Sequence, residues 1–228
     1  MDFDFTPYFN RYEELVRAAE DAFNRVKEDY SECVKCERGC ADCCHALFDL
    51  TLIEALYINY KFNETVKGDK KGQLLELANR ADRKTYKIKK RAYGLIKEGC
   101  KDEEILEKVA AETVRCALLN ENDLCELYDY RPITCRLYGV PTAIGGKGHT
   151  CGLSGFSEGT AYPTVNLDRI QNSLLALSKA LVADLKSKYV TMGEMLVPLS
   201  MALLTEYGDE FLGVGGESEG RSAGGKNE

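Results

Sequence analysis

Cysteine is the residue type through which this 228-residue chain could do chemistry, because eight of its ten cysteines fall into two groups of four. The first group is compact and the second is spread out; together they are Cys36, Cys40, Cys43, Cys44, Cys116, Cys125, Cys135 and Cys151. Four thiolates complete one tetrahedral metal site, so eight predict two sites or one larger cluster. The pattern indicates a metal-binding protein more strongly than it indicates any reaction.

The spacing of the cysteines bears on which metal they would bind. Adjacent Cys43 and Cys44 point in different directions in a helix or a strand, so both can ligate only if the turn is irregular or if they serve different metals. The second group lacks the paired C-x-x-C knuckles that are typical of structural zinc sites. Thiolate ligation suits zinc and iron-sulfur clusters alike. We favour one or two 4Fe-4S clusters, with zinc or iron ions as the alternative.

A packing role is the alternative for the first group. Cys33, Cys36, Cys40 and Cys43 recur at helical spacing, and free cysteine behaves as a small buried apolar residue. The residues around them are charged, however, and Gly39 would interrupt a helix. No long apolar face continues the stripe, which favours metal ligation over packing.

Four further residues could support a metal without being its main ligands. His45 and His149 are the two histidines of the chain, and each lies within two residues of a cysteine. They are candidate substitute ligands or hydrogen-bond donors, with an ordinary surface histidine as the alternative for each. Arg131 and Arg136 could offset the negative charge of clustered thiolates and donate to sulfur, although surface ion pairs would also explain them.

Helices must position these side chains, because capping signals and helical periodicity recur along the chain. We expect helices at about 7–30, 51–59, 72–97, 102–113, 168–189 and 193–207. Thr6 would cap the first, with Pro7 at its first helical position. The second would open at a capping box formed by Thr51 and Glu54, and the fifth at Asp168.

Strand structure is expected at residues 116–128, where two short apolar runs flank an Asn-Glu-Asn-Asp turn. Pro198 would kink the last helix. We therefore predict a mainly α fold, an irregular helical single domain over residues 1–212 with one small β-hairpin, built around a cysteine-ligated metal centre. Residues 213–228 are rich in glycine and serine and are expected to form a flexible tail.

Charge and hydropathy argue against two classes of partner. The net charge of -7 disfavours nucleic acid or an anionic membrane as the main partner. The chain has neither a signal peptide nor an apolar run long enough to span a bilayer, so we expect a cytoplasmic protein whose thiols stay reduced or bind metal. The helix predicted at residues 72–97 has a basic face over residues 80–97. This face is either a solvated surface or a docking site for an acidic redox or substrate protein.

The cysteines and their neighbours resemble a known family. CERGCADCC, the LTLIEAL downstream of it and RCALLNENDLCELYDYRPITCRLYG resemble the cysteine-cluster family of zinc- or iron-chelating domains, over about residues 33–155. The resemblance implies that the family's eight cysteines are those of the two groups, leaving Cys33 and Cys100 outside the set. A Tyr-x-x-Arg-Pro-x-x-Cys-Arg element of the family corresponds to Tyr128, Arg131, Pro132, Cys135 and Arg136.

Three functions are compatible with these observations. The resemblance implies an iron-sulfur protein in redox chemistry or electron transfer, which we favour. It also implies, through the flagellin lysine N-methylases that contain a similar domain, an iron-sulfur-dependent modifying enzyme using S-adenosylmethionine. Cys36, Cys40 and Cys43 have a C-x3-C-x2-C spacing that such an enzyme could use, but no α/β-barrel pattern accompanies it. A zinc-stabilised structural or interaction module is the third.

Overall fold

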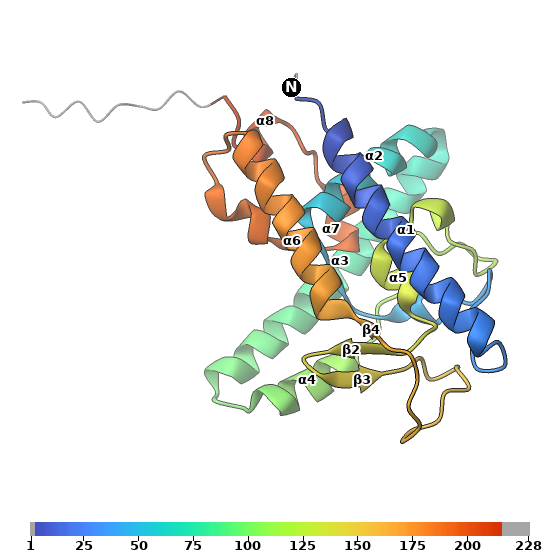
Figure 1. The fold of residues 1–228 in the computed structure, drawn as a ribbon. Coiled ribbons are helices and arrows are strands. Elements are labelled where there is room, and N and C mark those ends of the chain that lie inside the picture. The colour runs from blue at the N-terminus through green and yellow to red at the C-terminus, as the bar shows by residue number, and fades with distance from the viewer. Residues whose placement is uncertain (1–2, 216–228) are drawn as a thin grey trace, which may run out of the picture.

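The computed structural model describes residues 3–215, and helices make up most of the fold (Figure 1). The helices are α1 (Thr6–Asp29), α2 (Leu52–Thr65), α3 (Gly68–Lys97), α4 (Asp102–Ala110), α5 (Ile133–Leu137), α6 (Leu167–Asp184), α7 (Leu199–Leu204) and α8 (Asp209–Leu212). The predicted mainly α fold with a small β element is confirmed. Within residues 3–215, no helix combines the length and the apolar character that a membrane crossing requires.

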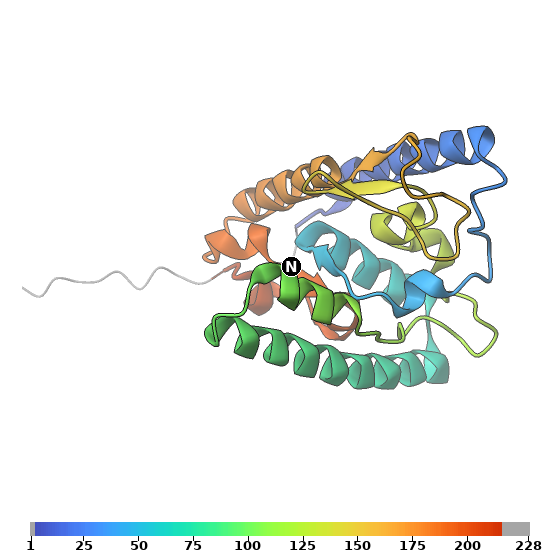
Figure 2. The same ribbon diagram turned by 90° about the horizontal axis from the view of Figure 1, so that it is seen from below.

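α2 is the central helix, and it separates two hydrophobic cores. Its buried apolar residues are Leu52, Ile53, Leu56 and Tyr57 towards the first core and Ala55, Ile58 and Phe62 towards the second. In Figure 2, α1 and α6 lie along one side of the molecule and α3 lies along the opposite side, with α2 and α5 between them. The first core therefore joins α2 to α1, α5 and α6, and the second joins it to α3 and α7.

The predicted capping box at the start of α2 is confirmed. The backbone N–H and the hydroxyl of Thr51 both donate to Oε2 of Glu54 at 3.3 Å, and both residues are buried. Leu52, the first helical residue, is fully buried as well. Local sequence and tertiary packing therefore agree at this helix start, which leads directly out of the first cysteine group.

Two other predicted caps are wrong. Phe5, not Thr6, precedes α1, and Oδ1 of Asp4 accepts the Thr6 N–H at 2.9 Å. Asn166, not Asp168, caps α6 by accepting from the N–H of Arg169. Asp168 instead accepts from the N–H of Gly145 at 2.8 Å, so tertiary contact redirects its carboxylate to a neighbouring turn.

The strands are short and form two small sheets. β1 (Asp49–Thr51) pairs antiparallel with β5 (Leu196–Pro198), and β2 (Thr142–Ile144) lies between antiparallel β3 (Lys147–His149) and parallel β4 (Val165–Asn166). The regular hairpin is β2–β3, which turns at Gly145 and Gly146 with positive φ at both.

The hairpin expected at 116–128 is reduced to one bridge between Leu119 and Cys125. Oδ1 of Asn120 accepts from the N–H groups of Asn122 and Leu124, so a side chain organises this turn where a longer ladder was expected.

The end of the chain departs furthest from prediction. The helix expected at 193–207 is divided, because Pro198 ends strand β5 in an extended conformation and α7 begins only at Leu199. The predicted tail begins at residue 213, yet the carbonyl of Gly213 accepts from Lys188 and Val214 packs against the first core. Residues 216–228 of the predicted tail lie outside the described residues.

Candidate metal centre

The first cysteine group lies in an irregular loop between α1 and α2. α1 ends at Asp29, and Gly39 has a φ of +98°, so the cysteines do not share a helical stripe, although Cys33 and Cys36 do pack against the first core. Cys43 and Cys44 sit in one short 3₁₀ turn, Asp42–His45. This is the irregular turn that would let two adjacent cysteines both face a metal site.

The second group reaches the first through backbone pairing. The N–H of Cys116 donates to the carbonyl of Cys44 at 2.7 Å, and the N–H of Val114 donates to the carbonyl of His45 at 3.1 Å. Cys116 is thereby placed beside Cys44, although the two are 72 positions apart in the chain. The turn closed by the Leu119–Cys125 bridge then brings Cys125 back towards Cys116.

Cys135 is positioned by α5, a helix of five residues. Pro132 precedes the helix in an extended conformation, with the φ of -63° that its ring imposes. Ile133, the first helical residue, donates its N–H to Oε1 of Glu54 at 3.4 Å. The carboxylate that caps α2 therefore also holds the start of the helix that carries Cys135.

Cys151 returns to the first group after the β2–β3 hairpin. Its thiol lies 3.4 Å from Oδ2 of Asp42, and its sulfur accepts from the N–H of Leu153. On the way, the backbone passes close to Cys36: a Cβ added to Gly139 would lie 2.3 Å from the Cβ of Cys36. A glycine is needed there because no side chain fits between the two segments.

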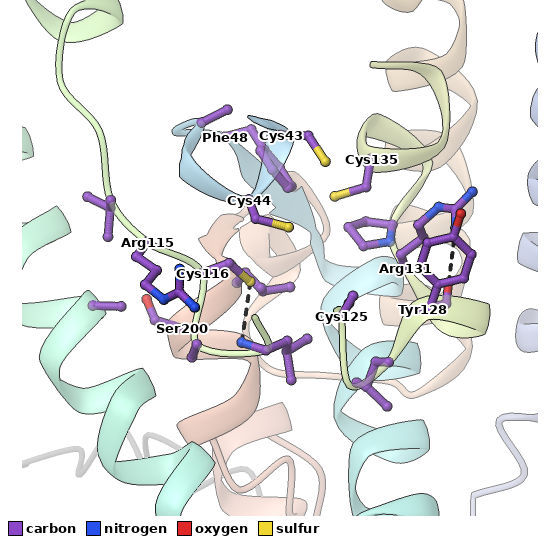
Figure 3. Close-up of a pocket in the computed structure, with 18 of the residues that line it drawn as sticks. Cys43, Cys44, Phe48, Arg115, Cys116, Cys125, Tyr128, Arg131, Cys135 and Ser200 are labelled. Carbon is purple, nitrogen blue, oxygen red and sulfur yellow. Dashed lines mark hydrogen bonds between the residues drawn. The ribbon is translucent and has the colours of Figure 1, made fainter. Parts of the chain in front are cut away.

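All eight family cysteines line two adjoining cavities, and their arrangement does not follow the sequence groups. The larger cavity, of about 100 Å³, is lined by Cys36, Cys40, Cys43, Cys44, Cys116, Cys125 and Cys135. The smaller, of about 10 Å³, is lined by Cys36, Cys40, Cys43 and Cys151. Cys36, Cys40 and Cys43 therefore line both cavities, whereas Cys151 lines only the smaller and Cys44, Cys116, Cys125 and Cys135 line only the larger. In Figure 3 the sulfurs of Cys43 and Cys135 point towards each other across the larger cavity.

Cys43 is the most acidic thiol that the structure identifies at this centre. The thiols of Cys135 and Cys44 donate to its sulfur, and these hydrogen bonds hold the pKa of Cys43 well below its ordinary value. The pKa values of Cys135 and Cys44 are raised, because their thiols donate to Cys43 and because both thiols are buried. Burial also raises the pKa of Cys116 to about 12.

Arg131 and Arg136, predicted as a pair, have different surroundings. Arg131 lines the larger cavity and its guanidinium lies 3.9 Å from the centre of the Tyr128 ring. Burial raises the pKa values of Cys36 and Cys125, and the positive charge of Arg131 opposes that rise. At Cys43 the same charge adds to the lowering of the pKa by the hydrogen bonds from Cys135 and Cys44. Arg131 is thus a counter-charge for the sulfurs.

Arg136 is buried and its guanidinium forms hydrogen bonds away from the sulfurs. It donates to the carbonyls of Asp129 and Arg131, at 2.5 and 2.9 Å, and to the carboxylate of Glu20 on α1. These bonds hold the loop 129–131 against α1. Arg136 therefore positions Arg131 through the backbone, whereas the sequence suggested that it donates to sulfur.

The two histidines do not line either cavity. Nδ1 of His45 lies 3.1 Å from the carbonyl of Ala41, within its own turn. His149 is exposed on β3, and its backbone pairs with Thr142. Although each histidine is close to a cysteine in the sequence, neither imidazole lines a cavity with the thiols.

The two cysteines outside the family set also lie away from the cavities. Cys33 packs against the first core, where its carbonyl accepts from the N–H of Gly155 at 2.8 Å. Cys100 follows the C-terminus of α3 and donates its N–H to the carbonyl of Leu95. All ten cysteines are free.

Asp42 and Glu54 are polar residues of the centre that sequence reasoning missed in this role. Asp42 lies between Cys40 and Cys43 in the sequence, which was the available signal, and its carboxylate accepts from the Cys151 thiol. Glu54 was recognised as a helix cap. Its second contact, to the helix carrying Cys135, has no counterpart in local sequence because it joins positions 79 apart.

The donor set fits a soft metal, but its spacing does not describe a mononuclear site. Within residues 3–215, no three His, Cys, Asp or Glu side chains converge closely enough to hold one ion. Four thiolates around a single zinc would bring their sulfurs to about 3.8 Å from one another, given zinc–sulfur bonds of roughly 2.3 Å. The thiols instead line the walls of a space larger than one ion.

Comparison with family models places this arrangement in a known group. The model CxxCxxCC, described as a putative zinc- or iron-chelating domain, matches residues 35–152. Comparisons with curated proteins and with solved structures gave no match. The matched region covers more than half of the chain and contains all eight cysteines that line the two cavities. The chain therefore belongs to the CxxCxxCC family of zinc- or iron-chelating domains.

Proposed function

We propose that this protein carries two iron-sulfur centres side by side and acts in electron transfer, in a reducing compartment such as the cytoplasm. Cys36, Cys40, Cys43 and Cys151 would hold one centre, and Cys44, Cys116, Cys125 and Cys135 would hold the other. When bound, such centres supply reversible one-electron transfer. The observation that carries the proposal is that Cys151 lines only the smaller cavity and Cys44, Cys116, Cys125 and Cys135 line only the larger, while Cys36, Cys40 and Cys43 line both.

The surroundings of the thiols support clusters over single zinc ions. The donors are thiols without a histidine, which suits iron-sulfur chemistry as well as zinc. The larger cavity offers about 100 Å³, well above the roughly 10–15 Å³ that one water-sized probe occupies, so it exceeds the needs of one ion. This argument applies to the larger cavity alone, because the smaller cavity is about 10 Å³. Arg131 offers a fixed positive charge at its wall, which would stabilise an anionic thiolate-ligated cluster.

Metal analysis combined with two cysteine substitutions tests the proposal. Protein purified without oxygen should contain iron and acid-labile sulfide in equal amounts, near eight of each per chain for two 4Fe-4S centres. Cys151→Ser removes a ligand of the first centre alone and Cys125→Ser a ligand of the second alone. Each should therefore lose about half of the iron and retain the circular dichroism of the fold.

Other outcomes would lead to different conclusions. If either substitution removes all of the iron, the eight cysteines hold one shared cluster and the division is wrong. One or two zinc ions without sulfide would instead support the structural module and would rule out electron transfer. Zinc would then be needed for folding, and a chelator should unfold the protein.

A second candidate is an S-adenosylmethionine-dependent enzyme similar to the lysine N-methylases. Its support is that Cys36, Cys40 and Cys43, with the C-x3-C-x2-C spacing, line both cavities and so adjoin free space. Against it, the described residues form strands of two or three residues rather than a parallel barrel. Saturation binding of S-adenosylmethionine to the iron-loaded protein, abolished by Cys40→Ser, would favour this candidate.

A further inference from the structure

α3 displays an uncompensated basic surface on the side away from the cysteines. The helix carries ten basic and three acidic residues in a chain whose net charge is -7, so the rest of the chain is at -14. Four of these cations have acidic partners: Lys70 with Glu126, Arg80 with Glu76, Lys89 with Asp49, and Arg91 with Glu112. The α3 basic face is defined as the four exposed cations between Arg83 and Lys90 that have no such partner among the described residues: Arg83, Lys84, Lys87 and Lys90.

The four cations lie together because of helical geometry. Arg83 and Lys87 are four residues apart, and Lys87 and Lys90 are three apart, so each pair is adjacent on the helix surface. Like charges at these spacings repel one another and destabilise a helix. Exposed Tyr86 and Tyr93 flank the same outward side, at 63% and 57% exposure. The surface therefore combines concentrated positive charge with aromatic groups, a combination found at protein interfaces.

The opposite side of α3 forms part of the wall of the metal centre. Ala81 and Thr85 line the larger cavity together with Cys43, Cys44 and Cys116. One helix thickness, about 10 Å, thus separates the α3 basic face from the cavity wall. In Figure 2, α3 runs along the edge of the molecule, where a partner could approach it over its whole length.

We infer that the α3 basic face is the docking site of an acidic electron-carrier protein that exchanges electrons with the cysteine-ligated centre. The identity of the partner as an electron carrier rests on the proposed function, whereas the acidic character rests on the unpaired cations. An acidic protein fits better than nucleic acid, because a long polyanion would extend from this helix onto the acidic remainder of the chain. A compact acidic partner meets only the complementary surface.

The test uses two variants with the same change in charge and two probes. The docking variant replaces each cation of the α3 basic face with glutamine. The control variant makes four glutamine substitutions at basic residues on other elements: Arg25, Lys27, Lys147 and Arg169. The probes are an acidic 2Fe-2S ferredoxin and an acidic flavodoxin, both oxidised, titrated calorimetrically into the iron-loaded protein at low ionic strength. Because neither probe is reduced, binding is measured without electron transfer.

We expect at least one probe to bind the wild-type chain, and its affinity to fall with rising salt. The docking variant should weaken binding by tenfold or more, and the control variant by less than threefold. Absence of binding by both probes, or equal loss in the two variants, would overturn the inference. Tighter binding of single-stranded RNA or of phosphatidylserine vesicles to the same four cations would overturn it too.

The outcome for docking is separable from that for the proposed function. If the purified chain contains zinc but the docking variant alone loses the acidic probe, the surface is real and electron transfer is wrong. If the chain contains iron and sulfide and neither probe binds, electron transfer stands and the docking site is wrong.

Discussion

Replacing Glu54 with glutamine should change how the stability of the protein depends on pH. Glu54 is buried on the central helix α2, and burial raises the pKa of its carboxyl to about 6 from 4.5. An acid with a raised pKa in the folded state binds its proton more tightly there than in the unfolded chain. Its contribution therefore favours folding at low pH and is lost as the pH rises through the interval from 4.5 to 6.

The size of the effect follows from those two values. A difference of about 1.5 pKa units corresponds to roughly 2 kcal/mol at pH values well above 6. Between pH 5 and pH 7.5 the wild type should lose about 1.2 kcal/mol of unfolding free energy through this group alone. Glu54→Gln removes the titration. It also forfeits one hydrogen bond, because its amide nitrogen must face either Thr51 or Ile133, at a pH-independent cost of about 1 kcal/mol.

The assay is urea unfolding of wild type and variant across pH 5 to 7.5, followed by circular dichroism. The unfolding free energy of the wild type minus that of the variant should be about 1.2 kcal/mol smaller at pH 7.5 than at pH 5. Glu64→Gln is the matched control, because Glu64 is half exposed and contacts only Lys61 on the surface of α2. Parallel pH profiles for wild type and Glu54→Gln would refute the assignment of a buried, proton-binding Glu54.

Three further predictions concern the metal centre. Gly139→Ala places a methyl group 2.3 Å from the Cβ of Cys36 and should lower the metal bound per chain by half or more, measured by elemental analysis. Gly152→Ala, with no atom within 4 Å of the added carbon, should leave it unchanged. Cys100→Ala should retain full metal content, because Cys100 lines neither cavity, and a fall in metal would show that the ligand set is incomplete. Arg131→Gln removes a positive charge that favours the thiolate form of nearby cysteines. When metal uptake is measured by reconstitution at a series of pH values, the midpoint pH of uptake should therefore rise by roughly one unit. An unchanged uptake midpoint would contradict that role of Arg131.

Local signals in the sequence predicted the helices well. The capping box at Thr51 depends on residues three positions apart, and the end of α3 depends on Gly99, whose φ is +77°. Such signals are contained within a few residues and are visible without the fold. The caps of α1 and α6 were missed because several polar residues compete at each start. Tertiary contact decides among them, as it does when Asp168 turns to Gly145.

The division of the cysteines between the cavities could not be predicted from spacing. It depends on the pairing of Cys116 with Cys44 and on the return of Cys151 to Asp42, contacts that join residues 72 and 109 positions apart. The roles of the two arginines were likewise indistinguishable in the sequence. Burial of Arg136 against Glu20 and the exposure of Arg131 to the cavity are properties of the packed structure.

The exchange of Cys44 and Cys151 between the sequence groups has a consequence for biosynthesis. On the ribosome, the chain emerges from its N-terminus, so the first four cysteines leave the exit tunnel long before the last. Neither proposed set of four can be completed by the early group alone: one needs Cys151 and the other needs Cys116, Cys125 and Cys135. Metal loading should therefore follow synthesis of almost the whole family domain. A nascent chain arrested before residue 116 would present the first cysteine group without any of the later cysteines that each proposed set requires.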